Sequence, residues 1–124
     1  MKVQTLSISN FKTYKGVSYD SIELHYHQFG QAIGNAPVVL VNNSLTGDSI
    51  VCGEKGWWNE IIGEGQTIDT NHYTILAFNI PGNGMLEQTF SSPKDFHAGD
   101  VAALFLVGLK VLGITNLFAL IGGS

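Results

Sequence analysis

The segment best suited to chemistry is Gly122-Gly123-Ser124, which directly follows the apolar run Leu117–Ile121. A nucleophilic serine must expose its hydroxyl at a sharp turn from a strand into a helix. Flanking glycines remove the Cβ clashes that such a turn would otherwise cause. Ser124 is therefore a candidate nucleophile for acyl transfer, and the alternative is an ordinary loop serine after a strand.

A second candidate segment, Asn43–Asp48, directly follows another apolar run, Pro37–Val41. In α/β-hydrolases the loop after the corresponding strand donates a backbone N–H to the oxyanion of the acyl intermediate. Such a donor is worth roughly 3–4 kcal/mol of barrier lowering. This loop could supply such a donor, and an ordinary loop with an Asx-type turn is the alternative.

The N-terminal region predicts an antiparallel hairpin. Residues Gln4–Phe11 and Ser21–Phe29 alternate polar and apolar side chains, as half-buried strands do. Gly16 and Asp20 lie between the two segments and favour a turn.

The rest of the chain predicts a mostly parallel sheet. The runs Pro37–Val41, Tyr73–Ile80 and Leu117–Ile121 are continuously apolar or nearly so, as in strands covered on both faces. A long helix is expected between the last two, from a capping serine and proline at residues 92–93 to a stop at Gly113. This order predicts an α/β fold. A short helix is also expected around Trp57–Ile62.

Composition excludes several classes of function. The chain has 124 residues, 13% of them charged, and a net charge of −4, which gives no reason to expect a nucleic-acid partner. The single cysteine, Cys52, excludes an internal disulfide and is expected to be an inert thiol. The most apolar stretch, Ala98–Leu112, is too short for a membrane span. With no signal peptide in the sequence, we expect a soluble cytoplasmic protein.

None of the four histidines is a credible catalytic base from its position in the sequence. His25 and His27 lie two residues apart on a predicted strand, and so on one face of it. Two histidines could bind a metal, but no third ligand is evident, and we expect surface histidines. His72 falls in a turn, and His97 falls in the first turns of the predicted helix.

Two acids and two tryptophans have structural interpretations. We expect the Asp48 carboxylate to brace its loop and Asp69 to belong to a turn before a strand. Trp57 and Trp58 could line a substrate channel or a partner surface, but covering the edge of the sheet is the favoured interpretation.

Several of these segments together resemble one known family. The chain is similar to the homoserine O-acetyltransferase family of α/β-hydrolase-fold enzymes between Phe29 and Ser124. The resemblance rests on motifs that occur in the family's order and at suitable spacing: Leu45-Thr46-Gly47-Asp48, Gly56-Trp57-Trp58, Ile68-Asp69-Thr70, Tyr73, Phe78-Asn79 and Gly122-Gly123-Ser124.

The resemblance implies the N-terminal part of an α/β-hydrolase fold, with residues 1–124 forming an incomplete domain whose C-terminal part is missing. It implies acetyl transfer from acetyl-CoA to the hydroxyl of homoserine, in methionine biosynthesis. Ser124 would form the acyl-serine intermediate and the Leu45 N–H would bind its oxyanion. Acetyl-CoA would be a co-substrate, with no bound cofactor or metal and no nucleic-acid or membrane partner. The full-length protein would be a homodimer.

The sequence leaves alternatives open. Many family members have His-Ala where this chain has Asn43-Ser44, and a Gly-Gly-Cys-type loop where it has Pro81–Gly84, so the acyl donor and acceptor stay undecided. A serine esterase that uses water is the first alternative, and a non-catalytic chain that acts by association is the second. We expect the 124-residue chain alone to be inactive, because in this fold the triad acid and histidine follow the serine in sequence.

Overall fold

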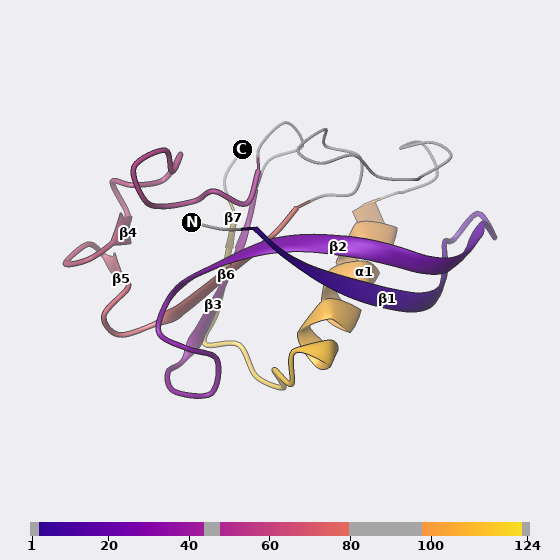
Figure 1. Cartoon of the computed structure of the whole chain (residues 1–124). Coiled ribbons are helices and arrows are strands. Elements are labelled where there is room, and N and C mark those ends of the chain that lie inside the picture. Colours follow the sequence, from indigo (N-terminus) through magenta and orange to yellow (C-terminus); the bar gives the residue numbers. More distant parts are fainter. Residues whose placement is uncertain (1–2, 44–47, 80–97, 123–124) are drawn as a thin grey trace.

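The computed structural model describes residues 3–43, 48–79 and 98–122, which form a five-stranded mixed sheet with one helix on one face (Figure 1). The strand order is β1-β2-β6-β3-β7. The elements of this layer are β1 (Gln4–Lys12), β2 (Ser18–Gly30), β3 (Val38–Asn42), β6 (Thr74–Phe78), α1 (Ala98–Val111) and β7 (Ala119–Gly122). A separate two-stranded pair consists of β4 (Ile62–Gly63) and β5 (Ile68–Asp69).

The pairing of the strands confirms the predicted α/β class with its antiparallel N-terminal hairpin. Strands β1 and β2 pair antiparallel, with Ile8 opposite Ile22, and β2 then pairs antiparallel with β6. Strands β6, β3 and β7 run parallel to one another. The described sheet is therefore parallel on one side and antiparallel on the other.

Helix α1 covers one face of the sheet and buries its apolar side chains there. Gly108 lets the helix approach closely, because a Cβ at this position would lie 2.7 Å from a Leu24 methyl carbon. The predicted stop is confirmed: Gly113 has a φ of 76°, and Ile114 N donates to Leu109 O just beyond the helix. The predicted start of the helix, at residues 92–95, lies outside the described residues.

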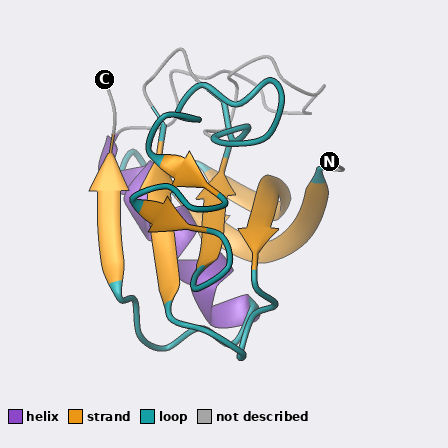
Figure 2. Cartoon of the chain, turned by 90° about the vertical axis from the view of Figure 1, so that its left-hand side faces the viewer, coloured by secondary structure: helices purple, strands orange, loops and turns teal. Residues whose placement is uncertain are grey.

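The segment 48–72 covers the opposite face, and Figure 2 looks onto this side with α1 behind the sheet. The helix predicted around Trp57–Ile62 is wrong, because this stretch forms consecutive turns. The N–H groups of Trp57 and Trp58 donate to Ile50 O and Val51 O, and Ile61 O accepts from Ile68 N. Ile61 N and Ile62 N both donate to Trp58 O, so a single helix-like turn forms, but it ends there because Ile62 begins β4 and pairs with β5.

Within the described residues, no helix has the length and apolar character needed to cross a membrane.

Candidate functional site

The carboxyl ends of the parallel strands form the edge of the sheet to which the predicted site residues belong. Asn42 at the end of β3 is paired with Gly122 at the end of β7, and β3 also pairs with β6. In open α/β sheets, ligands bind outside this edge. Leu45 and Ser124 lie outside the described residues, but they follow Asn42 by three residues and Gly122 by two. The two predicted site residues therefore follow neighbouring strands at one edge.

Ser49 and Asn79 form a buried pair at this edge. The Ser49 backbone N–H donates to Asn79 Oδ1 over 2.9 Å, and Asn79 Nδ2 donates to Ser49 Oγ over 2.6 Å. Both residues are almost fully buried, at 0% and 1% exposure. The Asn79 backbone N–H donates to His25 O over 2.8 Å, which ties the pair to β2.

His27 completes this cluster from β2. Its Nδ1 lies 2.5 Å from Ser49 Oγ in a buried hydrogen bond, and its ring stacks on Phe29 with a centroid distance of 5.9 Å. Burial lowers the pKa of His27, and the opposing effect of Asp48 is smaller. Burial thus favours the neutral imidazole.

The prediction of surface histidines at His25 and His27 is wrong. Both side chains are buried, at 5% and 3% exposure. The two histidines share one face of β2, and residues outside the sheet, such as Ser49 at His27, pack over this face. The alternation along β2 predicts that the two side chains share a face, but it does not predict that this face is buried. His25 Nδ1 bonds Thr5 Oγ1 over 2.9 Å, while its Nε2 is buried without a hydrogen-bond partner among the described residues.

Asn43 anchors the chain where it leaves β3. Its Nδ2 donates to Phe78 O over 2.9 Å, at the end of the neighbouring strand β6. The Asn43 Oδ1 is buried and has no hydrogen-bond partner within residues 3–43, 48–79 and 98–122.

The structural interpretations of the two acids are confirmed. Asp48 Oδ1 accepts from Ile50 N over 2.9 Å and so braces its loop. Asp69 Oδ1 accepts from the N–H groups of Gly65 and Asn71, and these two bonds are the main reason why the pKa of Asp69 is lowered. Among the described residues, Asp69 Oδ2 lies 3.7 Å from Nε2 of the exposed His72, which is too long for a triad hydrogen bond.

The two tryptophans stack on each other, with ring centroids 5.1 Å apart. Trp58 packs against the buried residues of this face, while Trp57 is 40% exposed and donates its indole N–H to Asp48 O over 2.9 Å. Trp58 therefore covers one face of the sheet and Trp57 holds the loop that contains Asp48, while coverage of the sheet edge stays a prediction.

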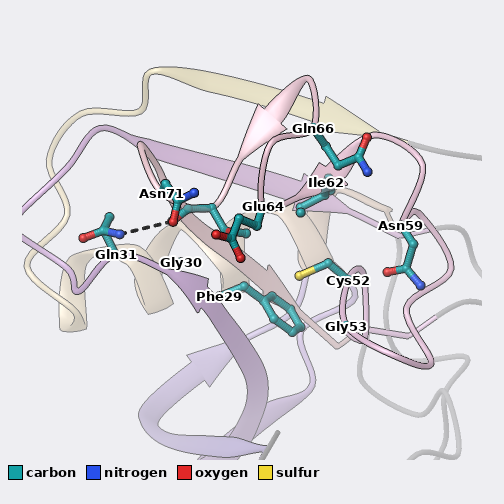
Figure 3. Close-up of a pocket in the computed structure, with 12 residues that line it drawn as sticks. Phe29, Gly30, Gln31, Cys52, Gly53, Asn59, Ile62, Glu64, Gln66 and Asn71 are labelled. Carbon is teal, nitrogen blue, oxygen red and sulfur yellow. Dashed lines mark hydrogen bonds between the residues drawn. The ribbon is translucent and has the colours of Figure 1, made fainter.

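A cavity of about 520 Å³ opens elsewhere, between the end of β2 and the β4–β5 pair (Figure 3). Gly30 in its wall pairs with Thr74, the first residue of β6, so the cavity lies toward the amino end of that strand. Burial raises the pKa of Cys52 in this wall to about 11, which keeps the thiol protonated and poorly nucleophilic at neutral pH. This cavity is thus separate from the predicted site.

Metal-binding groups are not brought together in the described ranges, since no cluster of three or more histidine, cysteine, aspartate or glutamate side chains occurs there.

Comparison with curated proteins finds homoserine O-acetyltransferases along nearly the whole chain. No protein-family profile matches the chain. The homoserine O-acetyltransferase of Methanocorpusculum labreanum is 35% identical over 128 residues, which cover 88% of this chain and 26% of the relative. That of Corynebacterium efficiens is 30% identical over 138 residues, covering 99% of this chain and 36% of the relative. The chain thus spans between a quarter and somewhat more than a third of the length of these relatives.

Solved structures agree with the fold. Homoserine O-acetyltransferase from Staphylococcus aureus matches with a TM-score of 0.81 and 32% identity, over 99% of this chain and 39% of that protein. Esterase E22 matches with a TM-score of 0.80 at 22% identity, over 99% of this chain and 40% of that protein. An acetylester hydrolase from Corynebacterium glutamicum matches with a TM-score of 0.76 at 25% identity, over 99% of this chain and 37% of that protein. The sheet is therefore part of an α/β-hydrolase fold.

Proposed function

Because the chain is homologous along nearly its whole length to curated homoserine O-acetyltransferases, we propose that the protein containing it transfers an acetyl group from acetyl-CoA to the hydroxyl of homoserine. The observation that carries the proposal is the combination of this homology with the strand order. The candidate nucleophile Ser124 and the candidate oxyanion donor Leu45 follow the paired ends of β7 and β3. The reaction would serve methionine biosynthesis.

The chemistry would proceed through an acyl-serine. Ser124 Oγ forms a bond to the thioester carbonyl carbon while its proton passes to a base, and the Leu45 N–H stabilises the resulting oxyanion. The C–S bond then breaks, and coenzyme A leaves as the thiol with that proton. The homoserine hydroxyl attacks the acyl-serine ester and gives its proton to the base, and Ser124 is regenerated as the acetyl ester departs.

The described histidines do not supply that base. His25 and His27 are buried in hydrogen bonds to Thr5 and Ser49, and His72 lies in the turn beside Asp69. We therefore propose that the 124-residue chain by itself is inactive and contributes only by association with the rest of the catalytic machinery. Labelling of Ser124 in the isolated chain by a fluorophosphonate, at the rate of an active serine hydrolase, would contradict this.

The decisive experiment uses the whole protein that contains this chain. Incubation with acetyl-CoA and homoserine is expected to release free coenzyme A, measured with a thiol reagent, and to form O-acetylhomoserine, measured by mass spectrometry. The variant Ser124→Ala is expected to do neither. Absence of homoserine-dependent coenzyme A release from the folded wild-type protein would overturn the proposal. Succinyl-CoA in a parallel reaction identifies the acyl donor.

A serine esterase is the second candidate, and the structural matches to esterase E22 and the acetylester hydrolase favour it. In that case water replaces homoserine as the acceptor, while the steps at Ser124 stay the same. Turnover of p-nitrophenyl acetate that does not respond to homoserine would support this candidate over the acyltransferase.

The proposal also covers where the whole protein is located in the cell and how many copies of it assemble. We expect a cytoplasmic homodimer that binds homoserine and acyl-CoA as its small-molecule partners. Light scattering coupled to size-exclusion chromatography of the whole protein measures the assembly, and a monomer would contradict it.

A further inference from the structure

The cavity between the end of β2 and the β4–β5 pair has an apolar floor and a polar rim. The floor consists of Phe29, Cys52 and Ile62, which are buried in one apolar cluster. The rim carries amide side chains and one carboxylate, from Gln31, Asn59, Gln66, Asn71 and Glu64. Small-molecule sites combine an apolar interior with a few polar groups and have volumes of about 300–1,000 Å³. The volume of this cavity, about 520 Å³, falls within that range.

Hydrogen bonds between the walls fix the shape of the cavity. Gln31 N donates to Tyr73 O over 3.0 Å, and Gln31 Nε2 donates to Thr70 O over 3.2 Å. Thr70 N in turn donates to Gly63 O over 3.2 Å. Gly30 has a φ of 77°, and a Cβ there would lie 2.9 Å from Thr70 O and closer still to Tyr73 O. The walls therefore approach this closely because residue 30 is glycine.

The ionisable groups of the lining give the cavity a negative charge. Glu64 is acidic, and none of the described residues that line the cavity is a lysine, arginine or histidine. The Cys52 thiol is neutral at pH 7, because burial raises its pKa to about 11. Figure 3 shows the Glu64 carboxylate pointing toward the space between Gly30 and Cys52. This charge disfavours anions, including the phosphates of coenzyme A, and favours a cation.

The polar groups of the rim are available to a ligand. Within residues 3–43, 48–79 and 98–122, the Glu64 carboxylate makes no ion pair. The side-chain amides of Asn59, Gln66 and Asn71 make no hydrogen bonds in the same ranges. An ammonium group is a donor of three hydrogen bonds, and its bonds to a carboxylate are among the stronger ones in proteins.

We propose that this cavity binds a small organic cation, an ammonium ion carried on an apolar body. The apolar body occupies the floor, and the ammonium group lies at the rim, where Glu64 supplies the opposite charge and the amide oxygens supply further acceptors. The cavity lies toward the amino end of β6, whereas the predicted acyl chemistry lies at the carboxyl edge of the sheet. The inference therefore does not rest on the proposed function.

The test measures binding of three probes to the whole protein at pH 7 by isothermal titration calorimetry. We expect 2-phenylethylammonium to bind with a Kd on the order of 0.1–1 mM. The anion 3-phenylpropionate has the same aromatic ring with the opposite charge, and ethylammonium keeps the charge without the ring. Both should bind at least about 10-fold more weakly, because each lacks one of the two contacts. Equal affinity for either of them would overturn the inference.

Two glutamate variants locate the bound cation. Glu64→Gln keeps the size of the side chain and removes its charge, so the Kd for 2-phenylethylammonium should rise by about 3- to 10-fold. The affinity for 3-phenylpropionate should not fall in this variant. Glu23→Gln is the matched control, because Glu23 is also exposed on the surface but lies seven residues before Gly30 on β2 and outside the lining. Its Kd values should equal those of the wild type.

The outcomes distinguish this inference from the proposed function. A protein that binds 2-phenylethylammonium through Glu64 but releases no coenzyme A retains the cation site and loses the proposed function. A protein that acetylates homoserine but shows no binding of the probe up to about 10 mM overturns the inference alone. If Glu64→Gln protein, folded by its urea unfolding midpoint, binds the probe as tightly as the wild type, the cation binds elsewhere and the inference is wrong.

Discussion

The two faces of the sheet differ in what they bury. The face against α1 buries mainly apolar side chains, among which Leu24 and Phe78 pack on the helix, and its buried carboxylate, Asp100 on α1, accepts from Tyr14 N. The opposite face buries an apolar cluster around Val41 and Ile75, and it also buries two polar side chains, His27 and Asn79. The same strands contribute to both faces, so the difference lies in the alternate residues and in what covers them.

The two faces therefore contribute differently: apolar burial adds stability to the fold, whereas buried hydrogen bonds also fix the positions of particular side chains. Apolar contacts stabilise without fixing a direction, whereas a buried polar group costs about 1–3 kcal/mol if its hydrogen bond is lost. The network of His27, Ser49 and Asn79 therefore holds its members in one arrangement. It is found on the face that continues into the predicted site, at the carboxyl edge of the sheet.

The largest expected effect is at that edge. Ser124→Ala in the whole protein removes the atom that forms the acyl bond, and kcat for coenzyme A release should fall by about 10⁴- to 10⁶-fold, as for other serine nucleophiles. The unfolding midpoint in urea should stay near the wild-type value. A variant that keeps more than a tenth of the activity would show that Ser124 is not the nucleophile.

On the helix-covered face, substitutions should change stability and not kcat. Leu104 on α1 is fully buried, and Leu104→Ala should lower the free energy of unfolding by about 2–5 kcal/mol through the cavity it leaves. Leu106 on the same helix is 55% exposed, and Leu106→Ala is the matched control. Its free energy of unfolding should change by less than about 0.5 kcal/mol. Urea unfolding measures both, and equal effects would contradict the assignment of the two helix faces.

The close contact at Gly108 gives a smaller effect of the same kind. A Cβ there would lie 2.7 Å from Leu24 Cδ2 and 3.1 Å from a Phe78 ring carbon. Gly108→Ala should therefore lower the free energy of unfolding by about 1–3 kcal/mol, despite the higher helix propensity of alanine. If Gly108→Ala instead raised the melting temperature, helix α1 would be able to move away from Leu24 and Phe78 without losing stability.

The sequence predicts the helix-covered face better than the other one. Alternation along Ser21–Phe29 predicts a strand with His25 and His27 on one face, and the observed strand β2, Ser18–Gly30, confirms the strand. Alternation cannot say which face is buried, because this depends on residues 48–72 folding over it. The helix predicted at Trp57–Ile62 fails for a similar reason, because after one turn closed on Trp58 O the chain pairs at Ile62 with Ile68, which the local pattern does not reveal.

The candidate site is predictable only in its order along the chain. The motifs around Leu45 and Ser124 and the strands before them indicate the edge where they belong, and the pairing of Asn42 with Gly122 agrees. Their roles stay predictions, because both residues lie outside the described ranges. Sequence reasoning missed the bonds from Asn79 to Ser49, although Phe78-Asn79 was part of the family resemblance. Parity along β6, which puts Asn79 on the face opposite Phe78, was the available signal.

The smallest expected effect is a pH dependence on the polar face. The pKa of His27 in the folded chain lies below its ordinary value of 6.5, mainly because of burial. Between the two pKa values the unfolded chain binds more protons, so unfolding becomes easier as the pH falls. The stability contributed by neutral His27 should be complete above about pH 6.5 and be lost progressively below it. The lowered pKa of Asp69 acts in a separate window, below its ordinary value of 3.8.

His27→Phe isolates this contribution, because it removes the titrating group and keeps the ring. We expect the free energy of unfolding, measured in urea at intervals between pH 5 and 8, to fall less steeply with acid in the variant than in the wild type. Other titrating groups are common to both proteins and cancel in the difference. Identical slopes would mean that His27 keeps its ordinary pKa in the folded protein. The His27 ring would then be accessible to solvent in the folded protein.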